Sequence, residues 1–252
     1  MLMAMTDTIA PRTERFAPYL SRYRAGEWRA PIMHDLIAED VRAAGQASTV
    51  LDIGCGKGLD DDLSLQRSLA AMCGSYVGVE PDPAVELGAY FSTVHRSILE
   101  EAEIPASSID VAVAVMVLEH LEKPELFWDK LHHCLKPGGV FWGFTVDGRS
   151  LFCLASQMTE RLRIKELYLH WLYGARGDTR YLNYPVFYRN NTPEQLAAHT
   201  QRFASCETFS FAREGQHRPT MPRPLHGVAD RFDRWVVAND KPGTLLAVRV
   251  VR

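Results

Sequence analysis

An apolar run that opens into three evenly spaced glycines constrains this chain more than any other feature of its sequence. Residues 50–58 read Val-Leu-Asp-Ile-Gly-Cys-Gly-Lys-Gly. Because glycine has no Cβ, the backbone at Gly54, Gly56 and Gly58 can adopt positive φ and approach a bound molecule closely. The next stretch, about 60–73, has a helical pattern, and the first N–H groups of a helix are available to a ligand. The pattern predicts a buried strand, a ligand-contacting loop and a helix.

The loop departs from the fingerprint of dinucleotide-binding proteins. That fingerprint, Gly-x-Gly-x-x-Gly, requires a third glycine where this chain has Leu59. The turn also contains Asp52, which would repel a pyrophosphate but would accept an amino group or water. A second apolar run, 76–79, ends at Glu80, the place of an acid that binds ribose hydroxyls. These features favour a nucleoside with cationic or hydroxylated groups and disfavour a nicotinamide oxidoreductase.

Four sequence blocks, taken in order, resemble the class I S-adenosylmethionine-dependent methyltransferases, in particular those that act on small molecules. They are Leu-Asp-Ile-Gly-Cys-Gly-Lys-Gly at 51–58, Val-Gly-Val-Glu-Pro-Asp at 77–82, the run from Ile104 to Leu121 that ends in Val-Leu-Glu-His-Leu, and Leu-Lys-Pro-Gly-Gly-Val-Phe at 135–141. Together they cover roughly 48–146, and their joint spacing is far more specific than a single glycine loop.

The resemblance implies a binding site for S-adenosylmethionine, with S-adenosylhomocysteine as the product. Asp52 would hold the loop and meet the cofactor's amino group, and Glu80 would accept from both ribose hydroxyls. Ile98 stands where the family commonly has an acid, so adenine recognition would fall to the Leu99 backbone, with Glu100 as a substitute partner. The implied cofactor-binding residues are Asp52, Gly54, Cys55, Gly56, Gly58, Glu80, Pro81, Ile98, Leu99, Val115 and Met116.

Two histidines are candidates for the general base that a hydroxyl acceptor would need. His120 follows the third block, and His170 lies in the long stretch after the fourth. Candidate substrate-binding residues in that stretch are Tyr173, Tyr184, Tyr188 and Arg189. The alternative is that these side chains fasten the stretch to the rest of the domain. No His, Asp or Glu cluster has the spacing of metal ligands, so no metal is expected.

The alternation of apolar runs and helical patterns predicts an α/β fold with helices on both faces of a mostly parallel sheet. The resemblance implies a Rossmann-like sheet of seven strands, the last one antiparallel, and the long stretch adds a helical lid insertion. Strands are expected near 49–53, 75–80, 92–96, 109–116, 139–146, 206–212 and 244–251, and helices near 60–73, 83–90 and 123–135.

We expect all 252 residues to form a single domain. Its parts would be an N-terminal helical cap over 1–48, a cofactor-binding core over 49–146, a substrate-lid insertion over 147–205 and C-terminal strands over 206–252. The insertion is too long for an ordinary connection. Within the cap, residues 12–34 combine aromatic side chains with five arginines. They either fold over the cofactor or pack their aromatic rings onto the domain.

Charge is distributed unevenly along the chain. Residues 1–148 hold 12 Lys+Arg and 22 Asp+Glu, a net charge of −10, whereas 149–234 hold 13 and 8, a net charge of +5. A basic insertion over an acidic core favours an anionic or sugar-containing acceptor, and the alternative is that the arginines only solvate the insertion. The overall net charge of −3 and the lack of a dense basic stripe disfavour nucleic acid.

The remaining features bear on location and partners. The five cysteines are scattered without a Cys-x-x-Cys pair, which suits a reducing compartment. The longest strictly apolar run, 111–118, is far shorter than the roughly 20 residues that span a bilayer. We therefore expect a cytoplasmic monomer or homodimer, without membrane or nucleic-acid partners, that methylates oxygen or nitrogen of a small molecule. The alternatives are a protein or RNA methyltransferase and a non-catalytic S-adenosylmethionine-binding module.

Overall fold

One seven-stranded sheet forms the centre of the molecule in the computed structural model, which describes residues 14–151, 153–154 and 185–252. The strand order is β3-β2-β1-β4-β5-β7-β6, and β7 runs antiparallel to both of its neighbours while the other pairs are parallel. The strands are β1 Thr49–Ile53, β2 Ser75–Val79, β3 Thr93–His95, β4 Ile109–Val115, β5 Leu135–Val146, β6 Ser205–Phe211 and β7 Leu245–Val251. The predicted sheet, with its antiparallel last strand, is confirmed.

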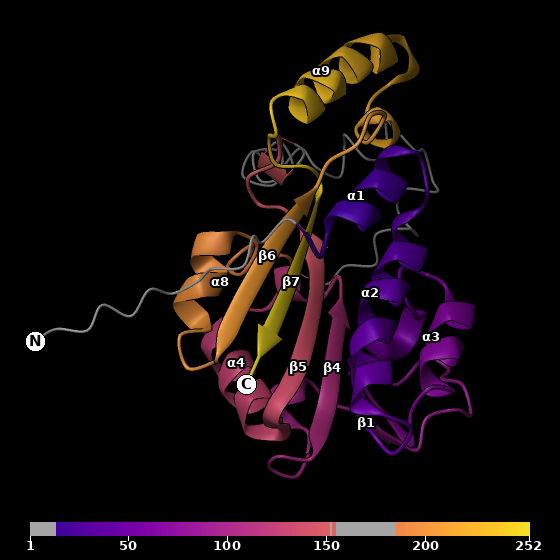
Figure 1. Ribbon diagram of the computed structural model, residues 1–252, viewed down its shortest axis with the longest axis vertical. Helices are drawn as coiled ribbons and strands as arrows, with labels where there is room; N and C mark the ends of the chain where they lie inside the picture. The colour runs from indigo at the N-terminus through magenta and orange to yellow at the C-terminus, as the bar shows by residue number, and fades with distance from the viewer. Residues whose placement is uncertain (1–13, 152, 155–184) are drawn as a thin grey trace, which may run out of the picture.

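Helices cover both faces of this sheet, as Figure 1 shows. On one face lie α1 Ala17–Arg24, α2 Arg29–Ala44 and α3 Leu63–Ala70, and on the other lie α4 Pro124–Cys134 and α8 Pro193–His199. A further helix, α9 His226–Ala238, stands beyond one end of the sheet. This arrangement confirms the predicted helices on both faces.

The central strands divide their side chains between two apolar cores, because successive residues of a strand point to opposite faces. Val111 and Val113 of β4 face the core beneath α1, α2 and α3, whereas Ala112 and Ala114 face the core beneath α4 and α8. All four side chains are fully or almost fully buried. Such double burial explains why β4 reads as a continuous apolar run.

The helix expected over 60–73 is shorter than predicted. A 3-10 turn, Cys55–Lys57, continues the glycine loop, and α3 begins only at Leu63. Asp62 sets this start because its carboxylate accepts from the backbone N–H groups of Ser64 (2.9 Å) and Leu65 (3.2 Å). The glycine loop is therefore separated from α3 by several residues instead of running directly into it.

The helix expected over 83–90 does not form. Proline at 81 and 83 and glycine at 88 interrupt this stretch. Its carbonyl groups bind a side chain instead of helical N–H groups, because Arg96 donates to the carbonyl oxygens of Asp82 (2.9 Å) and Val85 (3.0 Å). The propensity of single residues was thus overridden by a side chain from outside the stretch.

Strand β5 begins earlier than the expected 139. Leu135 pairs with Ile109, and the pairing then shifts before Val111 meets Val140. Gly138 adopts φ +78° within this irregular stretch, which a residue with a side chain seldom adopts. Lys136-Pro137-Gly138-Gly139 therefore bulges within the strand instead of preceding it.

The N-terminal aromatic residues pack onto the sheet. Phe16 is fully buried, with its ring stacked on Phe209 at 4.8 Å and edge-on to Trp142 at 6.1 Å. Tyr19 and Tyr23 of α1 are also buried. Of the two interpretations of residues 12–34, these contacts support packing onto the domain.

The stretch between β6 and β7 contains a helix that the sequence analysis did not anticipate. Phe211 pairs with Leu245, and Leu245 pairs with Val146, so residues 212–244 leave and rejoin the sheet beside the carboxyl end of β5. This β6–β7 insertion contains two short 3-10 turns and α9. It places α9 beyond the end of the sheet in Figure 1.

Candidate cofactor and acceptor site

The glycine loop lies at the carboxyl end of β1 and is tied to β2. The Gly54 N–H donates to the carbonyl oxygen of Val79 (2.8 Å). Gly54 adopts φ +72°, and a Cβ there would lie 2.6 Å from Cγ2 of Val117. Gly58 has a similar φ of +71°. Glycine is therefore required in this loop both by backbone conformation and by close contact.

Glu80 joins the end of β2 to the same loop. Its carboxylate is buried and accepts from the backbone N–H groups of Gly56 (2.9 Å) and Asp82 (3.0 Å). A Cβ at Gly56 would lie 2.5 Å from Oε2 of Glu80 and 2.8 Å from Cγ1 of Val85. The close approach of loop and carboxylate therefore depends on glycine at position 56.

Asp52 holds the loop from below. Its buried Oδ2 accepts from the Gln66 amide and the Tyr76 hydroxyl, both at 2.7 Å, and the Gln66 amide also donates to the Cys55 carbonyl oxygen (2.8 Å). Burial raises the pKa of Asp52 to about 6, and the nearby charge of Glu80 adds to this rise against the effect of the two hydrogen bonds. The predicted role of Asp52 in holding the loop thus has a physical basis in Gln66.

Cys55 is fully buried within the glycine loop. Burial is the main cause that raises the pKa of its thiol far above the ordinary value, and the nearby Asp52 and Glu80 carboxylates add to it. A Cβ at Gly78 would lie 2.8 Å from the sulfur, so the thiol packs against the backbone of β2. These surroundings are typical of an inert packed cysteine.

The end of β3 leads to the residues expected at the adenine. Leu99 is buried and begins the 3-10 turn Leu99–Glu101, so its N–H has no partner within that turn. Ile98 is 45% exposed, and Pro81 is also exposed. Burial raises the pKa of the Glu100 carboxyl. Ile98 offers an apolar surface where the family commonly has an acid.

Strain marks the carboxyl end of β4. Met116 adopts φ +54°, an uncommon conformation for a residue with a side chain, and its N–H donates to the carbonyl oxygen of Phe144 (2.7 Å). Val115 and Met116 are half-buried. Val117 follows and contacts the glycine loop at Gly54. Such strain is concentrated at ligand sites in proteins, which agrees with the position expected for the cofactor.

The turn after β4 carries His120 and a carboxyl group that the sequence analysis did not single out. His120 Nδ1 lies 2.9 Å from the Pro185 carbonyl oxygen. Glu119 is buried and accepts from the Thr145 hydroxyl (2.7 Å). Burial raises the pKa of Glu119, against opposing effects that include the charges of His120 and Arg29. Glu119 directly precedes His120 in the third sequence block, and this position was the signal that could have identified it.

The same turn fastens the segment 185–191. The Glu119 carbonyl oxygen accepts from the N–H groups of Phe187 (2.9 Å) and Tyr188 (3.3 Å). Asn191 donates to the Thr145 hydroxyl (2.6 Å) and to the Val146 carbonyl oxygen (3.1 Å). The segment therefore closes over the carboxyl ends of β4 and β5.

Polar atoms remain without a partner in this buried cluster. Oδ1 of Asn191 and Nδ2 of Asn190 are both buried, and neither has a hydrogen bond among the described residues. The other amide atom of Asn190 accepts from Trp128 Nε1 (3.2 Å). Buried polar groups are normally paired, so these two atoms are exceptions within the cluster.

The structure brings together only some of the predicted acceptor residues. Tyr188 lies beside the His120 turn, with φ +52°. Arg189 donates to the Glu122 carbonyl oxygen (2.6 Å) and lies over the Phe187 ring. His170, Tyr173 and Tyr184 lie outside the described residues.

An ion pair that sequence analysis missed joins α2 to the glycine loop. Arg29, at the start of α2, donates to both carboxylate oxygens of Asp60 at 2.6 and 2.7 Å. Asp60 follows the loop with φ +52°. Because the Arg29 charge also acts on Glu119, this guanidinium lies near both the loop and the His120 turn. Neither position has a local motif that would have predicted the pair.

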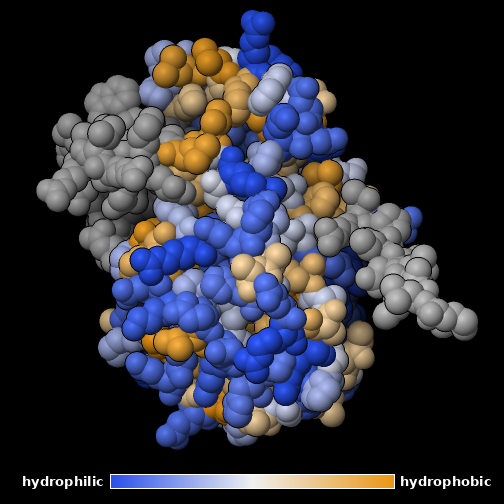
Figure 2. All heavy atoms as spheres, turned by 90° about the vertical axis from the view of Figure 1, so that its left-hand side faces the viewer, coloured by the Kyte–Doolittle hydropathy of each residue, from blue (hydrophilic) through white to orange (hydrophobic). Residues whose placement is uncertain are grey.

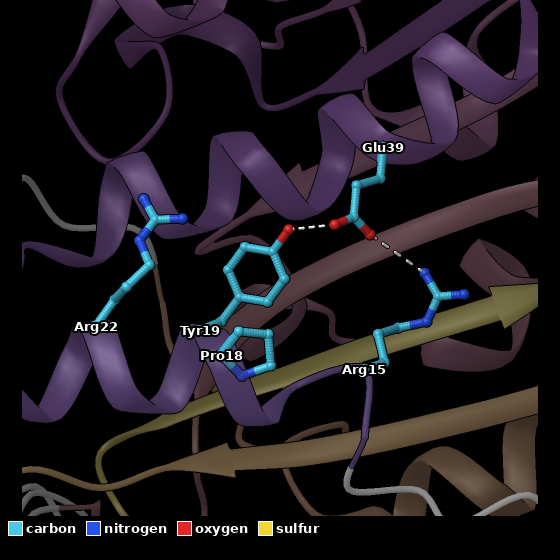
Figure 3. Close-up of a pocket in the computed structure, with 5 residues that line it drawn as sticks. All are labelled: Arg15, Pro18, Tyr19, Arg22 and Glu39. Atoms are coloured by element: carbon cyan, nitrogen blue, oxygen red, sulfur yellow. Dashed lines mark hydrogen bonds and ion pairs between the residues drawn. The ribbon is translucent and has the colours of Figure 1, made fainter.

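A separate pocket of about 440 Å³ lies between α1 and α2 and is drawn in Figure 3. It is lined by Arg15, Pro18, Tyr19, Arg22 and Glu39. The Tyr19 hydroxyl donates to Glu39, and Arg15 pairs with the same carboxylate at 3.6 Å. Arg22 is paired with acids outside the pocket lining. The pocket contains none of the motif residues, and its cations are already neutralised.

Most of the chain matches a known protein family. Residues 9–186 match the model of a family described as a methyltransferase domain. This match covers more than half of the chain, so the chain belongs to the methyltransferase-domain family.

Curated relatives agree with this class. The chain is 33% identical over 113 residues to a ubiquinone biosynthesis O-methyltransferase of Pseudomonas paraeruginosa, covering 43% of this chain and 48% of that protein. It is 31% identical over 142 residues to a probable S-adenosylmethionine-dependent methyltransferase of Mycolicibacterium smegmatis, covering 55% and 52%. The matches therefore span about half the length of these relatives.

Solved structures share the fold at low identity. A methyltransferase from Mesorhizobium loti aligns with a TM-score of 0.54 at 17% identity, covering 90% of this chain and 99% of that chain. Phosphoethanolamine N-methyltransferase 2 of Haemonchus contortus, in complex with S-adenosyl-L-methionine, aligns with a TM-score of 0.53 at 14% identity, covering 93% and 56%. These structures confirm the predicted class I fold.

Proposed function

We propose that this methyltransferase transfers a methyl group to a hydroxyl oxygen of a small molecule, with His120 as the general base. The observation that carries the proposal is the contact between His120 Nδ1 and the Pro185 carbonyl oxygen at 2.9 Å. A carbonyl oxygen can only accept, so Nδ1 donates in this contact, and in the neutral form of this tautomer the lone pair of the ring is on Nε2. That is the form of the ring that can remove a proton from a hydroxyl.

Asp52, the glycine loop and Glu80, which we call the glycine edge, fit the cofactor. Gly56 lets the loop approach the Glu80 carboxylate closely, which holds this carboxylate beside the loop. Asp52, the glycine loop and Glu80 would hold the amino acid and ribose parts, and Leu99 with Ile98 would lie at the adenine. When bound, S-adenosylmethionine supplies an activated methyl group on a positively charged sulfur.

The protein's own contribution is to position the acceptor and exclude water. Met116 and His120 are separated by only three residues after β4, so the floor of the cofactor site and the base lie on one short turn. The segment 185–191, fastened to the Glu119 carbonyl oxygen and to Thr145, covers this turn. A rigidly held base and acceptor reduce the entropy that must be lost on reaction.

Two observations support a small hydroxylated acceptor. Several relatives are named ubiquinone biosynthesis O-methyltransferases, which says that those proteins methylate oxygen. In addition, the net charge of +5 over residues 149–234 would favour an acceptor that also carries an anionic group. A protein or RNA methyltransferase and a non-catalytic binding module remain the alternatives that experiments must separate.

Calorimetric titration with S-adenosylmethionine and S-adenosylhomocysteine tests the cofactor half of the proposal. The wild type should bind both, and Glu80→Ala should weaken binding about 10- to 100-fold because hydrogen bonds to a charged partner contribute about 1.5–3 kcal/mol. Glu103→Ala, at an exposed acid, is the matched control and should bind normally. Failure of the wild type to bind either compound would favour a protein that no longer transfers methyl groups.

Turnover of hydroxylated and amino-bearing small molecules tests the acceptor half. His120→Ala should lower kcat for a hydroxyl acceptor by about 100-fold or more, the usual contribution of a general base. His133→Ala, at an exposed histidine of α4, should leave kcat unchanged. Turnover of amines alone, or equal rates for the wild type and His120→Ala, would overturn the assignment of His120 to a hydroxyl acceptor.

A further inference from the structure

The outward side of α9 carries apolar side chains that no other described element covers. Val228 and Trp235 are 63% and 50% exposed, and Leu225, directly before the helix, is 47% exposed. Residues separated by three, four or seven positions share one side of a helix. Arg231 and Arg234 fall on this same outward side and are also exposed. We call Leu225, Val228, Arg231, Arg234 and Trp235 the α9 stripe.

The α9 stripe is positively charged because the acids of the helix are already engaged. Asp230 binds Arg218 through two contacts of 2.6 Å, and Asp233 is buried against His217. Within the described part of the chain, Arg231 and Arg234 make no ion pair or hydrogen bond. The stripe therefore presents two exposed guanidinium groups among apolar side chains, and the pKa of Asp230 is lowered by the hydrogen bonds of Arg218 and also by the charge of Arg234.

The exposed acids of the insertion lie off the helix. Glu214 precedes the first 3-10 turn, and Asp240 follows α9 and faces Arg24 at 3.7 Å. Neither interrupts the outward side between Leu225 and Trp235. The charge of the stripe itself therefore has one sign, and it complements a negatively charged surface.

The position of the stripe relates it to the site. The β6–β7 insertion leaves the sheet beside the carboxyl end of β5, the same edge that carries the glycine loop and the His120 turn. Figure 1 places α9 beyond that edge, and Figure 2 shows orange atoms beside blue ones at this end of the molecule. A surface that contacts the stripe would therefore lie at the same end of the molecule as the glycine loop and the His120 turn.

The chemistry of the stripe is that of a helix lying on a lipid surface. Tryptophan is enriched at the boundary between membrane and water, and arginine on the polar side of such a helix attracts anionic lipids. Among the described helices, none combines the length and the apolar character needed to cross a membrane. A surface helix has no such requirement.

We propose that the α9 stripe docks this protein reversibly onto an anionic lipid surface. Trp235, Val228 and Leu225 enter the boundary layer, and Arg231 and Arg234 contact the headgroups. The carboxyl edge of the sheet then faces the lipid. The proposal is independent of the identity of the acceptor and of the role of His120.

Co-sedimentation of the full chain with vesicles tests the docking. One vesicle set is phosphatidylcholine alone, and the other is phosphatidylcholine with an equal part of phosphatidylglycerol. The wild type should bind the anionic vesicles at least about tenfold more tightly, and salt should weaken that binding. Replacing both arginines, Arg231→Gln with Arg234→Gln, should lower the affinity about fivefold for each charge, which corresponds to about 1 kcal/mol per residue.

A double variant and its control separate the apolar contribution of the stripe from non-specific binding through any exposed apolar side chain. Trp235→Ser with Val228→Ser should reduce binding to anionic vesicles by at least about tenfold, because apolar burial and charge act together at the interface. Leu126→Ser, at a 48%-exposed leucine of α4 outside the stripe, is the control and should bind like the wild type. All variants should keep the wild-type affinity for S-adenosylhomocysteine, which shows that they are folded.

Three results would overturn the proposal. They are a wild type that binds neither vesicle set, stripe variants that bind as well as the wild type, and equal losses in the stripe and Leu126 variants. Self-association of the wild type that Trp235→Ser abolishes, without any vesicle binding, would instead assign the stripe to contact between two copies of the chain.

Discussion

The glycine edge and the β6–β7 insertion lie at the same end of the sheet but are held there in different ways. At the glycine edge, backbone and side-chain hydrogen bonds converge on one loop, such as Gly56 N–H to Glu80 at 2.9 Å and Gln66 to Asp52 at 2.7 Å. The β6–β7 insertion is held by side-chain contacts spread along it, among them the buried contact between His217 and Asp233. The difference indicates that the glycine edge should stay folded when the insertion is disturbed. Four predictions test this difference between the two regions.

Removing Asp233 should have the largest effect, and it should be confined to the insertion. Asp233→Ala leaves the backbone N–H and the ring nitrogen of the buried His217 without their partner, and each buried group left unpaired costs about 1–3 kcal/mol. Hydrogen exchange should show lost protection over α9, while the affinity for S-adenosylhomocysteine stays within about twofold because a distant site is independent. A parallel loss of protection in β1 and β2 would show that the two regions are one cooperative unit.

Asp52→Asn should change stability in a pH-dependent manner at the glycine edge. Since burial raises the pKa of Asp52 from 3.8 to about 6, the folded protein retains a proton that the unfolded chain has lost between these pH values. Stability of the wild type therefore falls as pH rises from about 4 to 6, by about 3 kcal/mol, and stays lower above that range. The amide of the Asp52→Asn variant does not ionise, so this decline should disappear.

Urea unfolding of the wild type and Asp52→Asn across this pH range measures the effect. A constant difference between the two proteins at every pH would reflect the amide substitution alone. Such a result would show that the Asp52 carboxylate is not destabilised by its surroundings.

Gly56→Ala should weaken cofactor binding about 10- to 100-fold, the loss expected when the charged hydrogen bonds of Glu80 are displaced. The new Cβ would lie 2.5 Å from Oε2 of Glu80, so the carboxylate must move from the place where it meets the ligand. Calorimetry with S-adenosylhomocysteine measures the change. Gly227→Ala in α9, where a Cβ would meet nothing within 4 Å, should leave binding unchanged and stabilise the helix by about 1 kcal/mol or less. Equal effects of the two substitutions would remove the contrast between the regions.

Arg29→Lys should produce the smallest effect. Lysine cannot reproduce the bidentate ion pair with Asp60, so the free energy of unfolding should fall by about 1 kcal/mol or less. Thermal unfolding measures this, with Arg202→Lys at an exposed pair as a control that should unfold like the wild type. A large loss of cofactor affinity in Arg29→Lys would mean that α2 controls the glycine loop directly.

The same contrast explains which parts of the molecule could be predicted from sequence. The glycine loop and the Glu80 strand end were recognisable because the residues that make each feature are contiguous. The helix expected at 83–90 is absent because Pro83 and Gly88 disfavour it locally and because Arg96 binds the Val85 carbonyl oxygen, a tertiary contact that the sequence does not reveal.

Other features escaped the sequence analysis for different reasons. Helix α9 was not anticipated, although its apolar and charged residues have helical spacing, and the prolines at 219, 222 and 224 that precede it are typical of a loop. Glu119 and Asn191 meet Thr145 from separate parts of the chain. Pairing over 26 and 46 positions cannot be derived from spacing alone.

In the proposed site, the contacts of Glu80 also limit which sugar the glycine edge would bind. A carboxylate offers about four lone pairs, and the N–H groups of Gly56 and Asp82 occupy two of them. In the proposed cofactor site, the two remaining lone pairs would each accept from one hydroxyl of a ribose. A 2′-deoxyribose would leave one buried acceptor without a donor, so the same short backbone contacts that hold the loop would also reject deoxynucleosides.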